Sequence, residues 1–197
     1  MIMENPEMAD KIASFTTVST PHRGTSLADI VFGVVPDSAH PYLGDMVNII
    51  GRMQGDPDPD SLEAGKNLTS EEMAAFNALT DNWEDGIPGV YCQSYSSAIT
   101  GMINDPLLQT GEFVMRVFGN ESPNDGAVSI QSAEYADFKG IEYGSKVFDE
   151  YGNELFHGVS HFAIVDRGIF IFPGNTPGFH APSFFRKIVK DLKARGF

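Results

Sequence analysis

Two residues of this sequence combine a titratable side chain with a turn that could present it. Asp125 lies between Asn124 and Gly126 in "SPNDGAVS", and His161 follows Gly158 in "FHGVSHFAIVD". An aspartate and then a histidine, each on a loop after a strand, is the order of the last two members of a Ser…Asp…His triad. There the carboxylate orients the imidazole, which transfers the proton of the nucleophile. An ordinary tight turn and a structural histidine would give the same local pattern, so the residues alone leave both interpretations open.

Two other groups have the spacing of metal ligands, and neither forms a complete set. His157 and His161 would share one face of a helix, but a glycine and a β-branched valine between them disfavour a helix. Asp56, Asp58 and Asp60 alternate as in calcium loops, but prolines intervene and the glutamate that ends an EF-hand loop is missing. We expect a solvated acidic loop at 55–61 and no metal at either place.

The composition is that of a globular protein with an excess of acid. The 197 residues carry a net charge of −14, and 42% of them are hydrophobic, which is enough for a buried core. This acidity argues against binding nucleic acid or anionic lipid. The only cysteine, Cys92, is expected to be buried in a strand. No segment has the length of a membrane span or the pattern of a signal peptide, so the compartment stays unknown.

The positions of the expected elements predict an α/β fold, because strands alternate with helical stretches. Residues 12–20 and 89–97 are predicted strands, the first of them bounded by Pro21. Residues 25–85 are expected to be helical and rich in loops. Asp125 is expected where one strand ends and the next begins, in the turn between "FVMRVFG" and "GAVSIQSA".

Two helices are predicted from their end signals. Thr69 and Glu72 fit a capping box ahead of "MAAFNAL". A C-terminal helix is expected to be capped by Ser183 and stopped by Gly196. The apolar positions with helical spacing are Met73, Phe76 and Leu79 in the first helix, and Phe185, Ile188, Val189 and Leu192 in the second.

The segment "MADKIASFTTVSTPHRGTSLADI" resembles the part of bacterial triacylglycerol lipases and related α/β-hydrolase esterases that follows the nucleophile helix. In that family a strand leads to a Pro-His-(Arg/Lys)-Gly turn and then to a lid-bearing insertion. The resemblance continues in the family's order through "NLTSEEMAAFN", "GVYCQSYSS", "NDGAVSIQSAEYADFKG" and "GVSHFAIVD". It implies the C-terminal part of an α/β-hydrolase fold, a mostly parallel sheet flanked by helices. Residues 1–197 would form one partial domain, with a helical lid or cap at 25–85.

The resemblance also implies roles for individual residues. Asp125 matches the triad acid and His161 the triad base. His22, with Gly24 and Thr25, falls in the turn near the site and would shape that turn rather than act as a base. Apolar residues of the insertion would suit the wall of an acyl pocket, and ordinary helix packing would explain them equally well. They are Ile30, Val31, Phe32, Met46, Ile49, Ile50 and Met53.

The sequence departs from the family pattern in two ways. It contains no G-x-S-x-G, so the nucleophile elbow would precede Met1, and without a nucleophile the chain would be inactive alone. Ala163 stands where many of these lipases have a calcium-binding aspartate. Asp105 resembles the earlier calcium ligand, but a lone carboxylate makes a poor site, so we expect no cofactor.

Three hypotheses of function stay open. In the first, the chain is the C-terminal part of a lipase or carboxylesterase and needs a complementing N-terminal half to act on acyl esters. In the second, it is a non-catalytic module that binds an acyl ligand or a partner. In the third, a serine of "QSYSS" or a water activated by His161 replaces the nucleophile. Under the first hypothesis the strand at 12–20 would be left as a sheet edge, through which the chain could self-associate.

Overall fold

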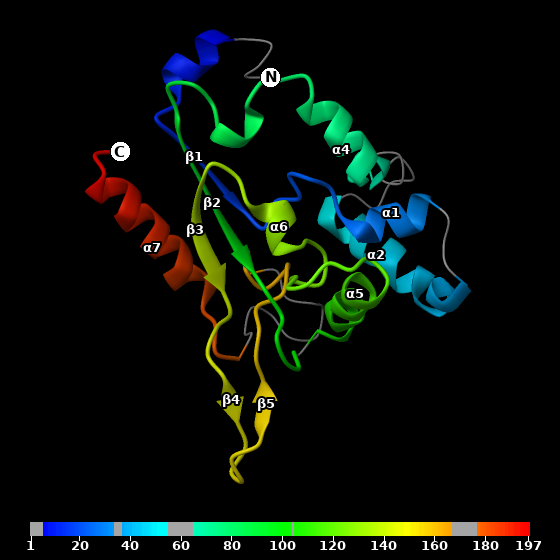
Figure 1. Ribbon diagram of the computed structural model, residues 1–197. Coiled ribbons are helices and arrows are strands. Elements are labelled where there is room, and N and C mark those ends of the chain that lie inside the picture. Colours follow the sequence, from blue (N-terminus) through cyan, green and yellow to red (C-terminus); the bar gives the residue numbers. More distant parts are fainter. Residues whose placement is uncertain (1–5, 34–36, 55–64, 104, 167–176) are drawn as a thin grey trace.

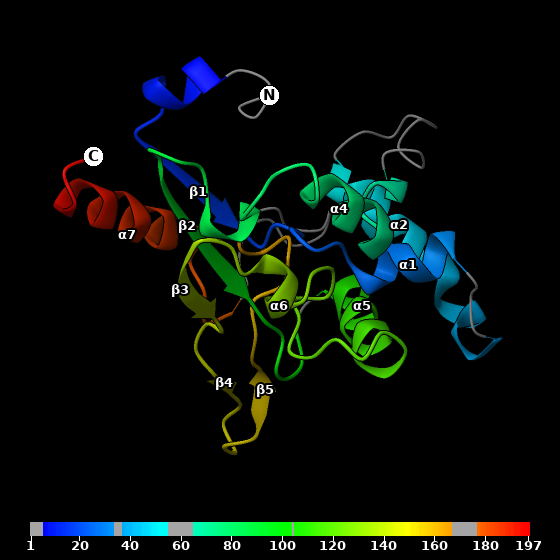
Figure 2. The same ribbon diagram turned by 45° about the horizontal axis from the view of Figure 1, so that its top comes forward.

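A computed structural model describes residues 6–33, 37–54, 65–103, 105–166 and 177–197. Figures 1 and 2 show a sheet with α7 on one side and α1, α2, α4, α5 and α6 on the other. The elements are η1 (Pro6–Lys11), β1 (Ser14–Val18), α1 (Ser26–Phe32), η2 (Asp37–Tyr42), α2 (Leu43–Gln54), α4 (Ser70–Asn77), η3 (Trp83–Asp85), β2 (Tyr91–Ser97), α5 (Pro106–Val117), α6 (Ile130–Ala133), β3 (Asp137–Glu142), β4 (Val147–Phe148), β5 (Glu154–Phe156) and α7 (Ala181–Ala194). The predicted loop at 55–61, with Asp56, Asp58 and Asp60, lies outside the described residues, as does the side chain of Met53.

The central sheet is parallel, in the order β1-β2-β3. Both predicted strands are confirmed with shorter bounds, and the sheet flanked by helices confirms the predicted α/β class. Cys92 is buried in β2, as expected. Among the described strands, β1 pairs with β2 alone and is therefore an edge.

The expectation that Asp125 joins two strands is wrong, because helices precede and follow its loop. The segment "FVMRVFG" lies mostly in α5, whose buried Leu108, Gly111 and Met115 recur at helical spacing. Pro106 in the first turn of α5 fixes the backbone for a helix start. The valines and phenylalanines suggested a strand, but packing of one helical face decided the outcome.

A strand and a hairpin were not predicted. β3 completes the sheet beside β2, and β4 pairs antiparallel with β5 in a hairpin that projects from the body (Figure 1). The Asp149 carboxylate closes the hairpin turn by accepting hydrogen bonds from the amides of Tyr151 and Asn153, at 2.9 and 2.8 Å. The turn-forming sequence "DEYGN" was the signal for this hairpin.

The C-terminal helix starts earlier than predicted. His180 is its N-cap residue and Pro182 lies in its first turn, so Ser183 is inside the helix and is not the cap. The hydroxyl of Ser183 instead hydrogen-bonds to Nδ1 of His180 at 2.8 Å. Gly196, with φ of +96°, follows the helix end as predicted.

The predicted apolar face of α7 is partly wrong. Phe184 and Ile188 are buried against the sheet, with Leu192 partly buried beside them. Phe185 and Val189 are 39% and 63% exposed. The helix is therefore rotated by about one residue from the predicted phase, which adjacent phenylalanines made ambiguous.

The helices that follow β1 build much of the core. α1 and α2 pack against α5, where Ile30, Met46, Ile49 and Ile50 are buried. Of the two explanations offered for the apolar residues of this segment, a pocket wall or helix packing, helix packing accounts for most of them. Val31 and Phe32 are partly buried against the same cluster.

Helix α4 begins as predicted, but its apolar residues are not in the core. The Thr69 hydroxyl accepts a hydrogen bond from the Glu72 amide at 3.4 Å, which confirms the cap. Phe76, however, is 56% exposed. The helix ends at Asn77, so Leu79 lies beyond it, contrary to the prediction, and is 73% exposed.

Among the described residues, no helix is long and apolar enough to cross a membrane.

Candidate functional site

Asp125 and His161, which are 36 positions apart in the sequence, lie side by side. Nδ1 of His161 is 3.0 Å from Oδ2 of Asp125. The chain just after β2 holds both loops in place. Ile99 donates its amide hydrogen to the carbonyl oxygen of Asn124 at 2.9 Å, and Val159 donates to that of Ala98 at 3.0 Å. The site therefore lies near the carboxyl end of the central strand, where ligand sites of parallel sheets form.

Hydrogen bonds within the loop and one glycine fix the conformation of the loop around Asp125. The side-chain oxygen of Asn124 accepts a hydrogen bond from Gly126 at 2.9 Å. Gly126 has φ of +90°, and a Cβ there would overlap the carbonyl oxygen of Leu108, so this position requires glycine. The buried Asp125 carboxylate accepts hydrogen bonds through Oδ1 from the amides of Ala127 and Val128, at 3.1 and 2.8 Å.

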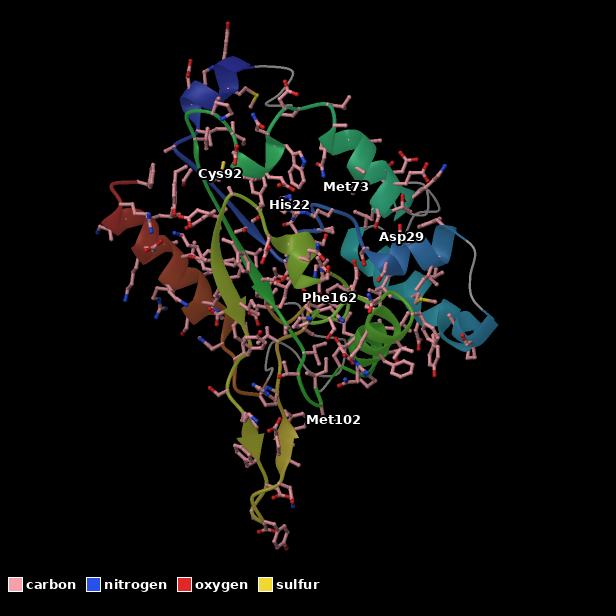
Figure 3. The ribbon with its side chains drawn as sticks, viewed as in Figure 1. His22, Asp29, Met73, Cys92, Met102 and Phe162 are labelled. Carbon is pink, nitrogen blue, oxygen red and sulfur yellow. The ribbon has the colours of Figure 1, made fainter. Side chains whose placement is uncertain are left out.

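The histidine is anchored by the residues beside it. Gly158 has φ of +141°, and a Cβ there would lie 2.7 Å from Cα of Ile99, so the loop can approach β2 only with glycine. Phe162 is buried in the main core, near the centre of the molecule in Figure 3. Because a carboxylate can only accept, Nδ1 of His161 carries the hydrogen, and Nε2 of the neutral ring is left as a proton acceptor.

Two buried serines support the carboxylate. The hydroxyl of Ser97 lies 3.4 Å from Oδ2 of Asp125 and 3.1 Å from the hydroxyl of Ser19. Sequence reasoning named the "QSYSS" serines only as candidate nucleophiles and missed Ser19. Ser97 contacts the Asp125 carboxylate, and in the described part of the chain no serine is hydrogen-bonded to His161. Small hydroxyl residues at the ends of the two neighbouring strands β1 and β2 were the available signal.

The predicted turn after β1 packs against the Asp125 loop. The hydroxyl of Thr25 donates to the carbonyl oxygen of Ala127 at 2.6 Å, and the hydroxyl of Ser132 donates to that of Gly24 at 2.6 Å. Gly24 has φ of +82°, and a Cβ there would lie 2.8 Å from the backbone of Ser70. Gly24 and Thr25 therefore fix the turn and help to place the loop around Asp125.

His22 is held in that turn as a neutral ring. It stacks on Tyr135 at 4.5 Å between ring centroids, and its Nε2 lies 3.1 Å from the hydroxyl of Thr17. Burial, together with the neighbouring Arg23 cation, lowers the pKa of His22 from 6.5 to about 4. Within the described residues, no hydrogen bond of the His22 side chain joins it to Asp125 or His161, so it takes no part in their pair.

The residues considered as metal ligands, Asp105 and His157, make hydrogen bonds within the protein. Asp105 caps α5 by accepting the amide hydrogen of Leu108 at 3.1 Å. His157 follows β5, is not helical, and lies 2.7 Å from the Thr100 hydroxyl through Nδ1. In the described ranges, no three His, Cys, Asp or Glu residues gather as metal ligands would.

Comparisons with known proteins point to lipases. The chain is 31% identical over 96 residues to triacylglycerol lipases of Pseudarthrobacter phenanthrenivorans and Burkholderia plantarii. Each match covers 45% of this chain, and the matches cover 30% and 26% of those proteins. No family model matches the chain.

Solved structures of one lipase are also similar. The mature form of the Bacillus licheniformis lipase BlEst2 matches with a TM-score of 0.47 and 23% identity, covering 69% of this chain and 49% of that one. The propeptide form matches with a TM-score of 0.48 and 22% identity, covering 71% and 27%.

The sequence matches confirm the resemblance to bacterial triacylglycerol lipases. The matched region spans less than a third of the length of the two curated relatives. This partial coverage agrees with the expectation that the chain corresponds to a portion of a lipase.

Proposed function

We propose that this chain, which resembles bacterial triacylglycerol lipases, carries the acid and the base of a Ser-His-Asp ester hydrolase. Asp125 would be the acid and His161 the base. The observation that carries the proposal is the 3.0 Å contact between Nδ1 of His161 and the buried carboxylate of Asp125.

The proposed chemistry follows from the tautomer that this contact favours. With its hydrogen on Nδ1, the imidazole can accept the proton of a serine hydroxyl through Nε2 as the serine oxygen attacks an ester carbonyl. Asp125 stabilises the resulting imidazolium. The imidazolium then returns the proton to the leaving alcohol as the tetrahedral intermediate collapses to an acyl-enzyme. Water attacks this acyl-enzyme next, with His161 again as the base.

The nucleophile in this proposal lies outside these 197 residues. The sequence contains no G-x-S-x-G, and the hydroxyl of Ser97 contacts Asp125 rather than the imidazole. The complementing segment would also supply the oxyanion hole and would pair with the free edge of β1. The chain alone would then be inactive. Residues 25–85 would cover the acyl site as a lid or cap.

The proposed hydrogen bond between His161 and Asp125 can be tested by nuclear magnetic resonance on the 197-residue chain. An imidazole hydrogen held by a buried carboxylate is expected far downfield and protected from exchange with water. We expect one such signal, which is lost in both Asp125→Ala and His161→Ala. His22→Phe is the matched control and should retain it. Absence of the signal from the folded wild-type chain would contradict the proposed tautomer.

The proposed nucleophile can be tested by reading the coding DNA upstream of Met1. We expect an in-frame G-x-S-x-G, and we expect the extended protein to hydrolyse a short-chain aryl ester. This turnover should fall to background in His161→Ala. An extended open reading frame without such a motif, or turnover that survives His161→Ala, would contradict the proposal.

A non-catalytic role is the second candidate, and the exposed residues of α4 favour it. Phe76 of α4 and Leu79, which follows the end of the helix, are exposed apolar side chains that a ligand or partner could cover. Titration of the 197-residue chain with a long-chain fatty acid distinguishes the two roles. Stoichiometric binding that is lost in Phe76→Ser but retained in His161→Ala would favour the binding module.

A further inference from the structure

The β4–β5 hairpin and the turn that joins its strands form an arm with unusual exposure, defined here as residues 145–156. Phe148, Tyr151 and Leu155 are 53%, 81% and 42% exposed. A two-stranded ribbon is marginally stable alone in water. Three large exposed apolar side chains on such a ribbon are typical of a surface that contacts a partner.

The outer face of α7 is the second unusual surface. Phe185 and Val189 are exposed there, four positions apart on one side of the helix. Five of the chain's 13 Lys and Arg residues lie within residues 186–195, where Asp191 is the only acid. We define Arg186, Lys187, Lys190 and Lys193, together with Phe185 and Val189, as the cationic face of α7.

The arm and the cationic face are complementary in charge. Residues 148–155 of the arm contain three carboxylates and no Lys or Arg. Glu154 is paired with Lys146 at 2.7 Å, whereas within the described residues Glu150 makes no ion pair. On α7, Lys187 is paired with Glu142 at 3.1 Å. In the same described ranges, the other three cations of the face have no carboxylate partner.

The arm and α7 begin side by side, at a point defined here as the junction. The amide of Ser145, at the base of the arm, donates a hydrogen bond to the carbonyl oxygen of Gly178, just before α7, at 2.7 Å. From there the arm and α7 point away from each other in both ribbon views (Figures 1 and 2). They cannot cover one another within one chain.

The arm and the helix also match in length. The 14 residues of α7 span about 21 Å at the helical rise, and the arm from Ser145 to Tyr151 spans about 20 Å at the rise of a strand. A two-fold axis through the junction would therefore lay each arm along α7 of the other copy. Glu150 lies about 17 Å along the arm, and Lys190 lies about 14 Å along α7. Measured from Ser145 and from Ala181, the two positions are at similar distances, so such a contact would bring them near one another.

We infer that two copies of this chain associate through a two-fold contact in which the arm of each lies along the cationic face of α7 of the other. Such a contact is the same on both copies and closes on itself, so it gives a dimer and no longer assembly. Phe148, Tyr151 and Leu155 bury their apolar area against Phe185 and Val189. Glu150, whose carboxylate makes no ion pair within the described residues, faces the cations of α7.

Charge reversal tests this contact by sedimentation velocity over a range of concentrations. The wild-type chain is expected to dimerise. Glu150→Lys and Lys190→Glu should each weaken the dimer by about tenfold or more, because each places like charges at both copies of the contact. An equimolar mixture of the two variants should form a heterodimer of wild-type affinity, since each of its two contacts again joins a carboxylate to an ammonium group.

The controls separate this contact from other causes. Asp81→Lys and Lys66→Glu make the same changes in net charge at exposed positions away from the arm and α7, and both should leave the dimer intact. If net charge alone mattered, Glu150→Lys would strengthen association of this acidic chain. A monomeric wild-type chain would overturn the inference. Dimers unchanged by either reversal but lost in Thr16→Pro, which blocks the β1 edge, would also overturn it.

Discussion

His161 and Asp125 are joined twice: by their side chains at 3.0 Å, and by a hydrogen bond from the His161 amide to the Asp125 carbonyl oxygen at 3.0 Å. The backbone bond fixes the spacing of the two loops, and the side-chain bond fixes the ring. A change that shifts one loop must therefore shift the other. This coupling makes the pair sensitive to the packing beneath both loops.

The buried carboxylate should be worth more to stability than an exposed one. Asp125→Ala leaves two amides and the imidazole N–H without an acceptor, so we expect a loss of about 3 kcal/mol in the free energy of unfolding. Asp125→Asn retains one oxygen for the amides and should cost about 1 kcal/mol. Urea denaturation measures both. Asp81→Ala, at an exposed position, should stay within about 0.5 kcal/mol of wild type, and an equal cost at both positions would contradict the role of the loop.

Substitution of Gly126 should be costly because a Cβ there would collide with Leu108. Gly89, which has a similar φ but no such contact, separates this collision from backbone strain. Gly126 and Gly89 have φ of +90° and +80°, but only at Gly126 would a Cβ meet another part of the chain. Gly89→Ala is expected to cost about 1 kcal/mol through backbone strain alone. Gly126→Ala should cost about 2 kcal/mol more, because the Asp125 loop must move away from α5. Equal thermal unfolding curves for the two variants would show that the close approach to Leu108 is not restrictive.

The burial of His22 beside the Arg23 cation predicts a pH dependence of stability. The pKa of His22 is about 4 in the folded chain and 6.5 when unfolded. Between these values the unfolded chain binds the proton more readily, so stability falls as pH decreases from about 6.5 to 4. The difference amounts to about 2 to 3 kcal/mol. The full contribution is present above pH 6.5.

His22→Phe keeps an aromatic ring against Tyr135 and removes the titration. The variant loses the contact with Thr17 at every pH, but its stability relative to wild type should improve as pH falls through this window. Urea unfolding at several pH values measures the difference. A constant offset between the two proteins from pH 7 to 4 would show that His22 titrates normally.

The edge of β1 can be examined by amide hydrogen exchange. The Ser19 amide donates to Tyr95 in β2, and amides alternate in direction along a strand, so those of Phe15 and Thr17 also face β2. The amides of Ser14, Thr16 and Val18 then face the free edge and should exchange much faster. Protection of both sets at the concentration of the dimer would indicate pairing through this edge instead of through the arm.

Some of these features could be predicted from sequence and others could not. The types and order of Asp125 and His161 follow a known chemical pattern, but it was the resemblance to lipases that singled them out, and the structure brings their side chains into contact. The support from Ser19 and Ser97 was hidden, because hydroxyl residues in a strand do not reveal whether they face water or a carboxylate. The phase of α7 was missed because Phe184 and Phe185 are adjacent, and only contact with the sheet decides which is buried.

The most direct measurement is the intact mass of the folded 197-residue chain after treatment with a fluorophosphonate ester, a reagent that labels activated serines. With the acid and base in place but no nucleophile, we expect no adduct, while the downfield imidazole signal shows that Asp125 and His161 remain paired. A stoichiometric adduct that disappears in His161→Ala would contradict this proposal, because a serine within these residues would then be the nucleophile.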